Sequence, residues 1–455
     1  MRPLRPRGTD AIPLPPRPQL EQYRKRAKGL VKACQSSDPD AIRAWARAWI
    51  GALADAAAIP TADETRARRL GRREVDNEVD RVVTDAVACG LAATEMATEP
   101  CTLADAQLFI ARLHDFESWP KFAAHVEALA RVNSPNAVFE AAADAVVTGD
   151  ERTLQSLLES DSSLVRARSA RDHRATLLHY IAANGHEGYR QITPPNAVRV
   201  ARMLLEAGAE PDAHAHMYGG DATTMDMLVS SVHPANAGVQ VALVDLLVDF
   251  GAAVNGVADN GSPVMTALAF GYPDAAAALA GRGARIDNVI SAAALGRIDT
   301  VAGLVTEDGR LRPDAPLAGV RWPRLPKDPQ VHLEFALTWA AAFGHRDVVE
   351  LLLERGVTAH AADNNLPAVH AAAARGHLDI VRLLLDHGAS LETLNSYGGT
   401  VLGSTLWFAY NSPVEGVRYA EVIRFLVDAG ANVDAGDGLR KWVDDVLTPT
   451  RLTSD

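Results

Sequence analysis

The sequence repeats one short pattern, an amphipathic helical segment that ends at a glycine. Three variants of this pattern are VVELLLERGVTAHAAD at 348–363, IVRLLLDHGASLETLN at 380–395 and VIRFLVDAGANVDAGD at 422–437. Glycine suits the end of such a helix, because the residue after the last turn adopts a positive φ that a Cβ atom disfavours. Recurrence at about 33 residues, with insertions, indicates stacked copies of one supersecondary unit. The predicted helix stops are Gly208, Gly251, Gly283, Gly356, Gly388 and Gly430.

A shorter, alanine-rich segment precedes most of these helices. Clear examples are LTWAAAFGHRDV at 337–348 and AVHAAAARGHLD at 368–379. Alanine is a strong helix former with a small side chain, so a helix of this kind packs close to its neighbours. The Gly-His pair then reverses the chain into the second helix. The predicted unit is a turn, a helix, a turn and a second helix.

These units resemble ankyrin repeats, whose consensus reads roughly DxxGxTPLHxAAxxGHxxIVxLLLxxGAxxN. The match is strongest at 368–392, and the TPLH tetrapeptide survives best at 176–179. The resemblance implies an all-α ankyrin-repeat solenoid of about eight helix-turn-helix units with short hairpin tips. Ankyrin arrays bind partners along an extended concave surface, so it also implies an interaction role. The expected units are about 135–169, 170–215, 216–257, 258–287, 288–315, 334–362, 363–394 and 395–437.

The parts outside the repeats suggest further segments. We expect a Pro/Arg-rich tail at 1–19, a helical N-terminal domain at 20–132, the array at 135–437, and a C-terminal cap and tail at 438–455. The N-terminal domain resembles a helical extension that accompanies ankyrin arrays in many bacterial proteins, and it would cap the first repeat, whose apolar flank is otherwise exposed. Prolines across 313–329 predict a loop that interrupts the array.

Charge and cysteine content limit the classes of partner. The formal net charge of −12 argues against a surface that coats nucleic acid, because neutralising phosphates needs a basic surface. Basic residues do gather near the N-terminus, so nucleic-acid regulation stays an alternative to a solvated tail there. The three cysteines form no CxxC pair, and no apolar run reaches the roughly 18 residues that cross a bilayer. We expect a cytoplasmic protein with no nucleic-acid partner and no membrane contact.

The sequence lacks the common phosphate-binding, dinucleotide-binding, zinc-protease and serine-hydrolase motifs. Histidines at the repeat positions are expected to hydrogen-bond within and between repeats. One group falls outside that explanation: Asp212, His214 and His216, with Asp221 behind them. Residues two apart in an extended segment point to the same side, so a shared metal is the alternative to ordinary exposed tip residues. A lone HxH is weak evidence, so we predict no metal and no cofactor.

Partner contacts are expected at large polar or aromatic residues on the hairpin tips and first helices. Tyr and Trp combine apolar area with a hydrogen-bonding end and are enriched at binding hot spots. Packing between repeats is the alternative for each of them. A YGG tip occurs twice, at 218–220 and 397–399, where the paired glycines permit positive φ. The candidates are Tyr180, Tyr218, Asp221, Trp339, Tyr397, Trp407 and Tyr410.

Together these features favour a non-catalytic module that binds a protein or peptide on its concave face. The alternative is an unconventional enzyme or small-molecule binder, whose groove is closed by the Pro-rich loop with Arg321 and Trp322 and by lengthened turns at 185–198, 233–240 and 411–419. An enclosed pocket with two or more titratable side chains would favour the alternative, and an open groove the interaction module.

Overall fold

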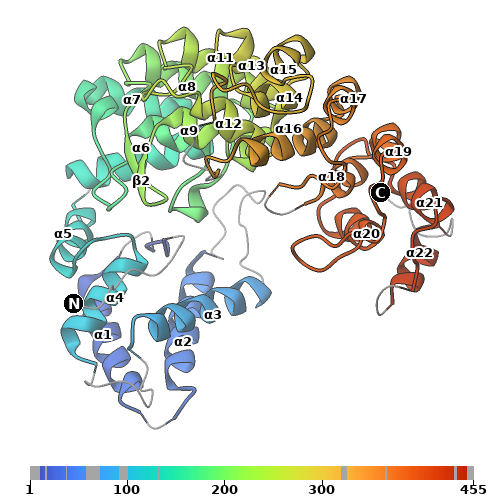
Figure 1. Ribbon diagram of the computed structural model, residues 1–455. Coiled ribbons are helices and arrows are strands. Elements are labelled where there is room, and N and C mark those ends of the chain that lie inside the picture. The colour runs from blue at the N-terminus through green and yellow to red at the C-terminus, as the bar shows by residue number, and fades with distance from the viewer. Residues whose placement is uncertain are drawn as a thin grey trace. The chain divides into compact units, whose positions relative to one another are not determined.

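A computed structural model describes the chain except at residues 1–10, 16–17, 37, 58–71, 92–100, 132, 319–324, 364–365, 435–437 and 448–455. The chain divides into two compact units, Met1–Ala252 and Ala253–Asp455. Helices dominate both, and one two-stranded antiparallel hairpin occurs among the described residues (Figure 1). Arg321 and Trp322 lie outside the described residues. The expected boundaries of tail, N-terminal domain and array stay predictions.

Five helices open the N-terminal unit: α1 (Leu20–Cys34), α2 (Ala41–Ala57), α3 (Arg72–Ala88), α4 (Leu103–Leu113) and α5 (Trp119–Leu129). An apolar core joins them, and it includes one face of α1. Aromatic rings meet edge-on at its centre, an arrangement that the ring quadrupole favours. The buried residues of α1 are Leu20, Tyr23, Ala27, Leu30 and Cys34.

Three repeat units complete the N-terminal unit. The first is α6 (Pro135–Thr148) with α7 (Glu151–Ser160), and the second is the 3-10 helix η2 (Leu177–Ala182) with α8 (Ala197–Glu206). The third begins with the hairpin β1 (Ala215–Met217) and β2 (Gly220–Ala222), in the register Met217 to Gly220. Its helices are α9 (Thr224–Leu228), α10 (Val232–Asn236) and α11 (Gln240–Asp249). Short 3-10 turns η1 (Ser162–Arg166) and η3 (Gly188–Arg190) lie between these elements.

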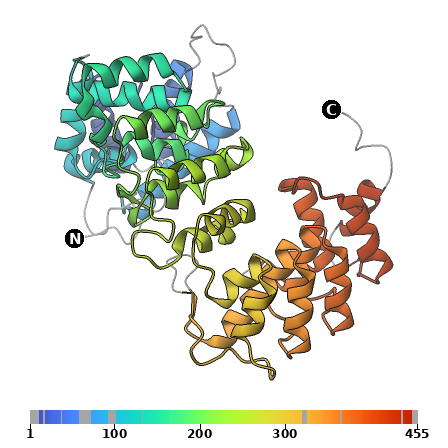
Figure 2. The same cartoon turned by 90° about the horizontal axis from the view of Figure 1, so that it is seen from above.

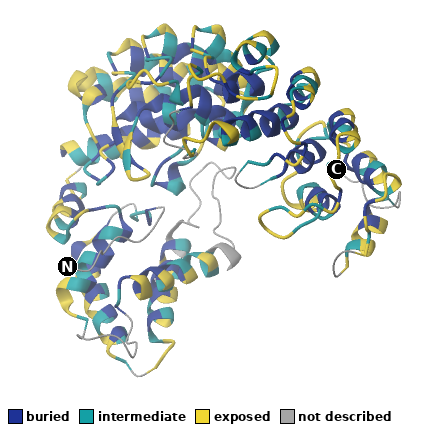
Figure 3. Cartoon of the chain, viewed as in Figure 1, coloured by how far each residue is buried: buried dark blue, intermediate teal, exposed yellow. Residues whose placement is uncertain are grey.

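The C-terminal unit continues the plan with helix pairs that stack in sequence order (Figure 2). The facing sides of these helices are buried, and the turns are exposed (Figure 3). The pairs are α12 (Ser262–Ala269) with α13 (Pro273–Gly281), α14 (Val289–Ala294) with α15 (Ile298–Leu304), α16 (Pro329–Phe343) with α17 (Arg346–Glu354), α18 (Ala368–Ala374) with α19 (Leu378–Asp386), and α20 (Val401–Asn411) with α21 (Tyr419–Asp428). Helix α22 (Leu439–Leu447) follows and contacts α20 and α21.

The six predicted helix stops all have the left-handed backbone that the sequence pattern requires, with φ between 91° and 98°. Repeat histidines also take the structural role expected of them. His345 Nε2 lies 2.9 Å from the carbonyl oxygen of Ala294, and His377 Nε2 lies 3.2 Å from that of Ala342. Each ring therefore bonds back to the end of the preceding unit's first helix. The all-α ankyrin-repeat solenoid is confirmed.

Two elements differ in detail from the sequence expectation. The first helix of the second unit is a 3-10 helix, which ends where Ala183 adopts a φ of 45° and the chain leaves for the inserted turn. Pro329, expected to end the Pro-rich loop 313–329, instead begins helix α16, because proline is tolerated at the first helical position and the Asp328 side chain caps the Gln330 amide at 2.9 Å.

Within the described ranges, no helix combines the length and the apolar character needed to cross a bilayer.

Candidate functional site

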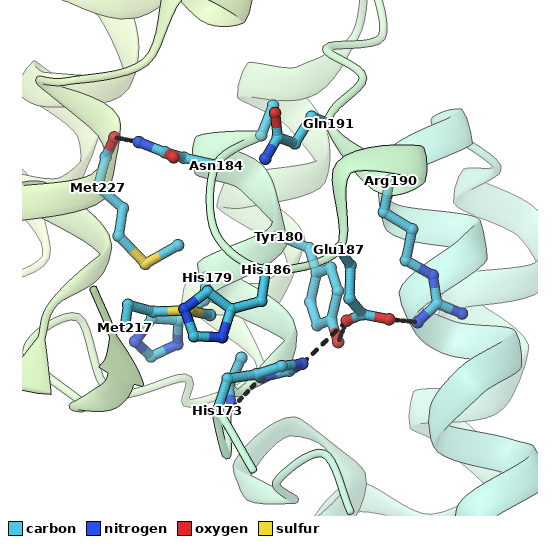
Figure 4. Close-up of a pocket in the computed structure, with 12 residues that line it drawn as sticks. His173, His179, Tyr180, Asn184, His186, Glu187, Arg190, Gln191, Met217 and Met227 are labelled. Atoms are coloured by element: carbon cyan, nitrogen blue, oxygen red, sulfur yellow. Dashed lines mark hydrogen bonds and ion pairs between the residues drawn. The ribbon is translucent and has the colours of Figure 1, made fainter. Parts of the chain in front are cut away.

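The lengthened turn 185–198 of the second unit folds inward and buries a carboxylate (Figure 4). Glu187 Oε2 accepts hydrogen bonds from His173 Nε2 at 3.0 Å and from the Tyr180 hydroxyl at 2.5 Å. The backbone amide of Ala175 donates to His173 Nδ1 at 3.0 Å, which leaves the proton of the neutral ring on Nε2. The ring is thus held in the tautomer that donates to the carboxylate.

Two arginines surround the same carboxylate. Arg190 Nη1 donates to Glu187 Oε1 at 3.0 Å, while Arg190 Nη2 lies 2.8 Å from Glu140 Oε2 and 2.7 Å from Asp144 Oδ1. Arg171 Nε lies 2.9 Å from the same Oε1 atom of Glu187. Glu140 and Asp144 belong to α6, so the ion pairs join the inserted turn of the second unit to the first unit.

Arg171 extends this network to the N-terminal helices. Its side chain is 1% exposed, and its Nη1 donates to the carbonyl oxygen of His114, next to the end of α4, at 2.9 Å. Its Nη2 donates to the Tyr189 hydroxyl at 3.1 Å, and that hydroxyl donates to Glu187 Oε1 at 2.5 Å. Burying this guanidinium is favourable only when all of its partners are present, because an unpaired buried charge is costly.

The pKa shifts within the network follow from burial and from the neighbouring charges. Burial opposes ionisation of Glu187, but Arg171 and Arg190 outweigh it and hold the pKa of that carboxyl well below its usual range. Burial and the Glu187 charge raise the pKa of Tyr180 well above 10. At neutral pH the cluster therefore contains an ionised glutamate, charged arginines and neutral tyrosines.

A small cavity lies beside this network. It is lined by His173, Tyr180, His186 and Glu187, with Met217 and Met227 on the other side (Figure 4). About 10 Å³ of its space is accessible, enough for about one water molecule. The cavity thus brings titratable groups together without room for a larger ligand.

A larger groove of about 640 Å³ opens between α5 and the hairpin tips of the second and third units. Its volume lies within the range of about 300 to 1,000 Å³ typical of ligand sites. Charged and polar side chains dominate its lining. They are Glu117, Lys121, His125, Asn136, Arg168, Arg171, Asp172, Arg174, His214, His216 and Asp221.

Two of the expected contact residues are buried. Tyr180 belongs to the network around Glu187, and Trp339 is 6% exposed, with its Nε1 donating to Asp363 Oδ2 at 3.4 Å. Both side chains take the packing role that was the alternative for them. Neither offers surface to a partner in this structure.

Three expected contact residues share the last helix pair and are exposed. Tyr397 is 84% exposed at the hairpin tip, while Trp407 and Tyr410 lie on α20 with about half of their surface exposed. The Tyr410 ring meets Trp442 of α22 edge-on, with 5.4 Å between centroids, and Trp442 is also exposed. Sequence reasoning missed Trp442, because it lies beyond the last recognised repeat.

Tyr218 and Asp221 lie at the hairpin of the third unit. Tyr218 and Gly219 have φ values of 51° and 79°, so the positive φ falls on the tyrosine and the first glycine rather than on the glycine pair. The Tyr218 hydroxyl accepts a hydrogen bond from the Gly185 amide at 2.9 Å, so the ring folds back toward the inserted turn. At the other tip Gly398 has positive φ, and the Asn395 side chain accepts from the Tyr397 amide at 3.0 Å.

The HxH group forms an exposed pair. His216 Nε2 lies 3.7 Å from Asp221 Oδ1, directly across the hairpin. Over the ranges that the structure describes, no group of three His, Cys, Asp or Glu side chains has an arrangement that could hold a metal ion.

Sequence reasoning did not single out Glu187, Tyr189, Arg190 or Arg171. The one available signal was the run HEGYR at 186–190, where the repeat consensus continues into its second helix and this chain inserts charged and aromatic residues.

Residues 337–437 match the family model of ankyrin repeats in three copies. The crystal structure of the human ASB11 ankyrin repeat domain resembles 64% of this chain and 96% of its own, at 20% identity and a TM-score of 0.31. No curated protein sequence matches the chain.

Proposed function

Since this chain is an ankyrin repeat-containing protein, we propose that it is a non-catalytic interaction module that binds a protein or peptide partner on the concave face of its array. Arrays of this kind form extended surfaces made of hairpin tips and first helices. We further propose that it acts in the cytoplasm, in agreement with its cysteine usage.

The exposed aromatic side chains of the last helix pair carry this proposal. Trp407 and Tyr410 belong to a first helix, and with Tyr397 and Trp442 they place four aromatic side chains on α20, α22 and the adjoining tip. The rings of Tyr410 and Trp442 are in contact, and Trp407 lies one turn before Tyr410 on α20, on a chain with only 5% aromatic residues. Aromatic anchors of this type dominate the energy of protein interfaces.

One observation favours the second candidate, an enzyme or small-molecule binder. The cavity of Figure 4 contains His173, Tyr180 and Glu187, and such a set of titratable groups is the usual mark of chemistry. However, both Glu187 oxygens already accept hydrogen bonds, and the space holds about one water. These contacts support a structural role for the cluster, so the interaction module remains the favoured function.

The test is affinity capture from the native cell, with mass spectrometry of proteins and of small molecules. A captured protein is then purified and titrated against the chain and against a Trp407→Ala/Tyr410→Ala variant. We expect at least tenfold weaker binding by the variant, because losing a hot-spot ring costs about 2 kcal/mol or more.

Phe270→Ala is the matched control, since Phe270 is also an exposed aromatic residue of the C-terminal unit but lies outside the proposed surface. Unchanged affinity in the aromatic double variant would refute this surface. A stoichiometric small molecule without any protein partner would favour the second candidate.

A further inference from the structure

The groove beside α5 is built from four separate parts of the N-terminal unit. Helix α5 and the turn before it supply Lys121, His125 and Glu117, and the start of α6 supplies Asn136. The tip segment 168–174 supplies Asp172 and its arginines, and the hairpin with the residue before it supplies His214, His216 and Asp221. The groove is partly open to solvent. Its volume of about 640 Å³ admits a short extended chain segment.

Two of the three acidic side chains that line the groove pair with a cation, and the third lies beside a histidine. Glu117 forms an ion pair with Lys121. Asp172 Oδ2 lies 3.6 Å from Nη1 of Arg112, and Asp221 Oδ1 lies 3.7 Å from His216 Nε2. The acidic groups of the groove are thus largely compensated.

Two exposed arginines differ from this pattern. Among the described residues, no carboxylate lies within the ion-pair distance of 4.0 Å of Arg168 or Arg174. Both guanidinium groups are thus without a direct ion pair to a described carboxylate, on a chain whose formal net charge is −12. Guanidinium groups present several donors in a planar fork that fits a carboxylate, so this part of the groove is suited to an anionic group.

The segment that presents these arginines is braced on both sides. Arg168 Nη1 donates to the carbonyl oxygens of Arg174 at 3.0 Å and His214 at 2.5 Å. The Asp172 amide donates to the Asp115 carbonyl oxygen at 2.7 Å, which ties the segment to the turn before α5. A site whose residues are already ordered loses less entropy when a ligand binds.

We propose that this groove binds an acidic peptide segment of the partner, with its carboxylates at Arg168 and Arg174. The inference rests on the proposed interaction function and specifies the chemistry of one partner surface. Single carboxylates spaced along a peptide can meet the two guanidinium groups and avoid the acidic side chains at the rim. A nucleic acid carries an unbroken row of phosphates, whereas the groove offers only two arginines without an ion pair to meet them.

The test is fluorescence anisotropy with the full chain and a labelled peptide of alternating glutamate and glycine. We expect binding that weakens as salt rises, and at least tenfold weaker binding by Arg174→Glu. That variant keeps the braced segment intact, since the Arg174 side chain makes no hydrogen bond or ion pair with a described residue. Arg168→Glu should weaken binding similarly.

Arg202→Glu is the matched control: it makes the same charge change at an exposed arginine of α8 outside the groove, and its affinity should equal that of the wild type. Equal binding of a glutamine-glycine peptide, tighter binding of a single-stranded oligonucleotide, or unchanged affinity in Arg174→Glu would each overturn the inference. If a captured partner depends on Trp407 and Tyr410 but not on Arg168 and Arg174, the proposed function stands and this inference fails.

Discussion

The two compact units use the same helix pairs but bury different chemistry. Among the described residues, every buried aspartate, glutamate and arginine lies in Met1–Ala252: Asp85, Arg171, Glu187 and Arg190. The buried polar side chains described in Ala253–Asp455 are Asn288, Ser291, His332, Thr338, His370, Ser404 and Thr405. One unit is therefore held partly by ion pairs, and the other by apolar packing with hydrogen-bonded amide, hydroxyl and imidazole groups.

The second and seventh repeats show the origin of this difference. In the seventh, α18 and α19 follow the consensus closely, and His370 bonds through Nδ1 to the Ser404 hydroxyl and through Nε2 to the Thr393 carbonyl, both at 2.8 Å. In the second repeat, the insertion 185–198 brings charged groups into the space between the first and second repeats. An insertion can thus change what stabilises a repeat without changing its helix-pair plan.

The largest expected difference between the two compact units is in how much stability each loses as the pH falls. Burial lowers the pKa of His114 to about 3 and the pKa values of His125 and His179 to about 4. These rings are neutral when folded but protonate near pH 6.5 when unfolded, so the unfolded state binds more protons in that window. The N-terminal unit should therefore lose about 1.4 kcal/mol per pH unit for each ring between pH 6.5 and its lowered pKa.

Glu187 acts in the same direction at lower pH. Its pKa is depressed in the folded state, so its contribution is present above the unfolded pKa and is lost as pH falls through the folded one. Burial lowers the pKa values of His332, His370 and His377 in the C-terminal unit by less. Segment-resolved hydrogen exchange from pH 7 to pH 4 checks this, and earlier opening of the C-terminal unit would contradict it.

Glu187→Gln should have the next largest effect. It leaves Arg171 and Arg190 buried with one carboxylate fewer, which typically costs about 3 to 5 kcal/mol. The free energy of unfolding from urea denaturation measures it. Glu206→Gln, at an exposed position of α8, is the control and should stay within about 0.5 kcal/mol of wild type. A loss below 1 kcal/mol in Glu187→Gln would show that the ion pairs contribute little.

His370→Ala tests the corresponding hydrogen bonds of the C-terminal unit. Removing the ring takes one hydrogen bond from the Thr393 carbonyl and one from the Ser404 hydroxyl, which still donates to the Val401 carbonyl at 3.1 Å; we expect a cost of about 1 to 3 kcal/mol. The loss should appear in the hydrogen exchange of Ala253–Asp455. His360→Ala, at an exposed position, should leave exchange unchanged. Equal effects of the two substitutions would mean that the buried bonds are replaced by water.

The smallest effect compares the two YGG tips. Tyr218→Phe removes the hydroxyl that accepts from the Gly185 amide and should cost about 1 kcal/mol. Tyr397→Phe removes an exposed hydroxyl and should change stability by less than about 0.5 kcal/mol. Thermal unfolding of both variants measures the difference. The same result for both would mean that the tips are equivalent after all.

The repeat architecture was predictable because its signals are local. Glycine stops, alanine-rich first helices and repeat histidines each depend on the backbone within one or two turns, and Gly208, His345 and His377 adopt the expected conformations or contacts. Local signals also placed Trp407 and Tyr410 on a first helix. Helical periodicity is encoded in residues three and four apart, so one sequence contains it completely.

Tertiary structure alone decided which charged and aromatic side chains are buried and which stay exposed. No periodic pattern relates Arg171 to Glu187, and their contact depends on the direction in which the inserted turn folds after Ala183. The same folding buries Tyr180 and brings the Gly185 amide to the Tyr218 hydroxyl, although the Tyr218 side chain stays 61% exposed. The Tyr397 tip has no inserted turn to contact and is 84% exposed. The sequence thus determines which units stack, while long-range contacts between insertions and neighbouring units decide which side chains remain free to bind.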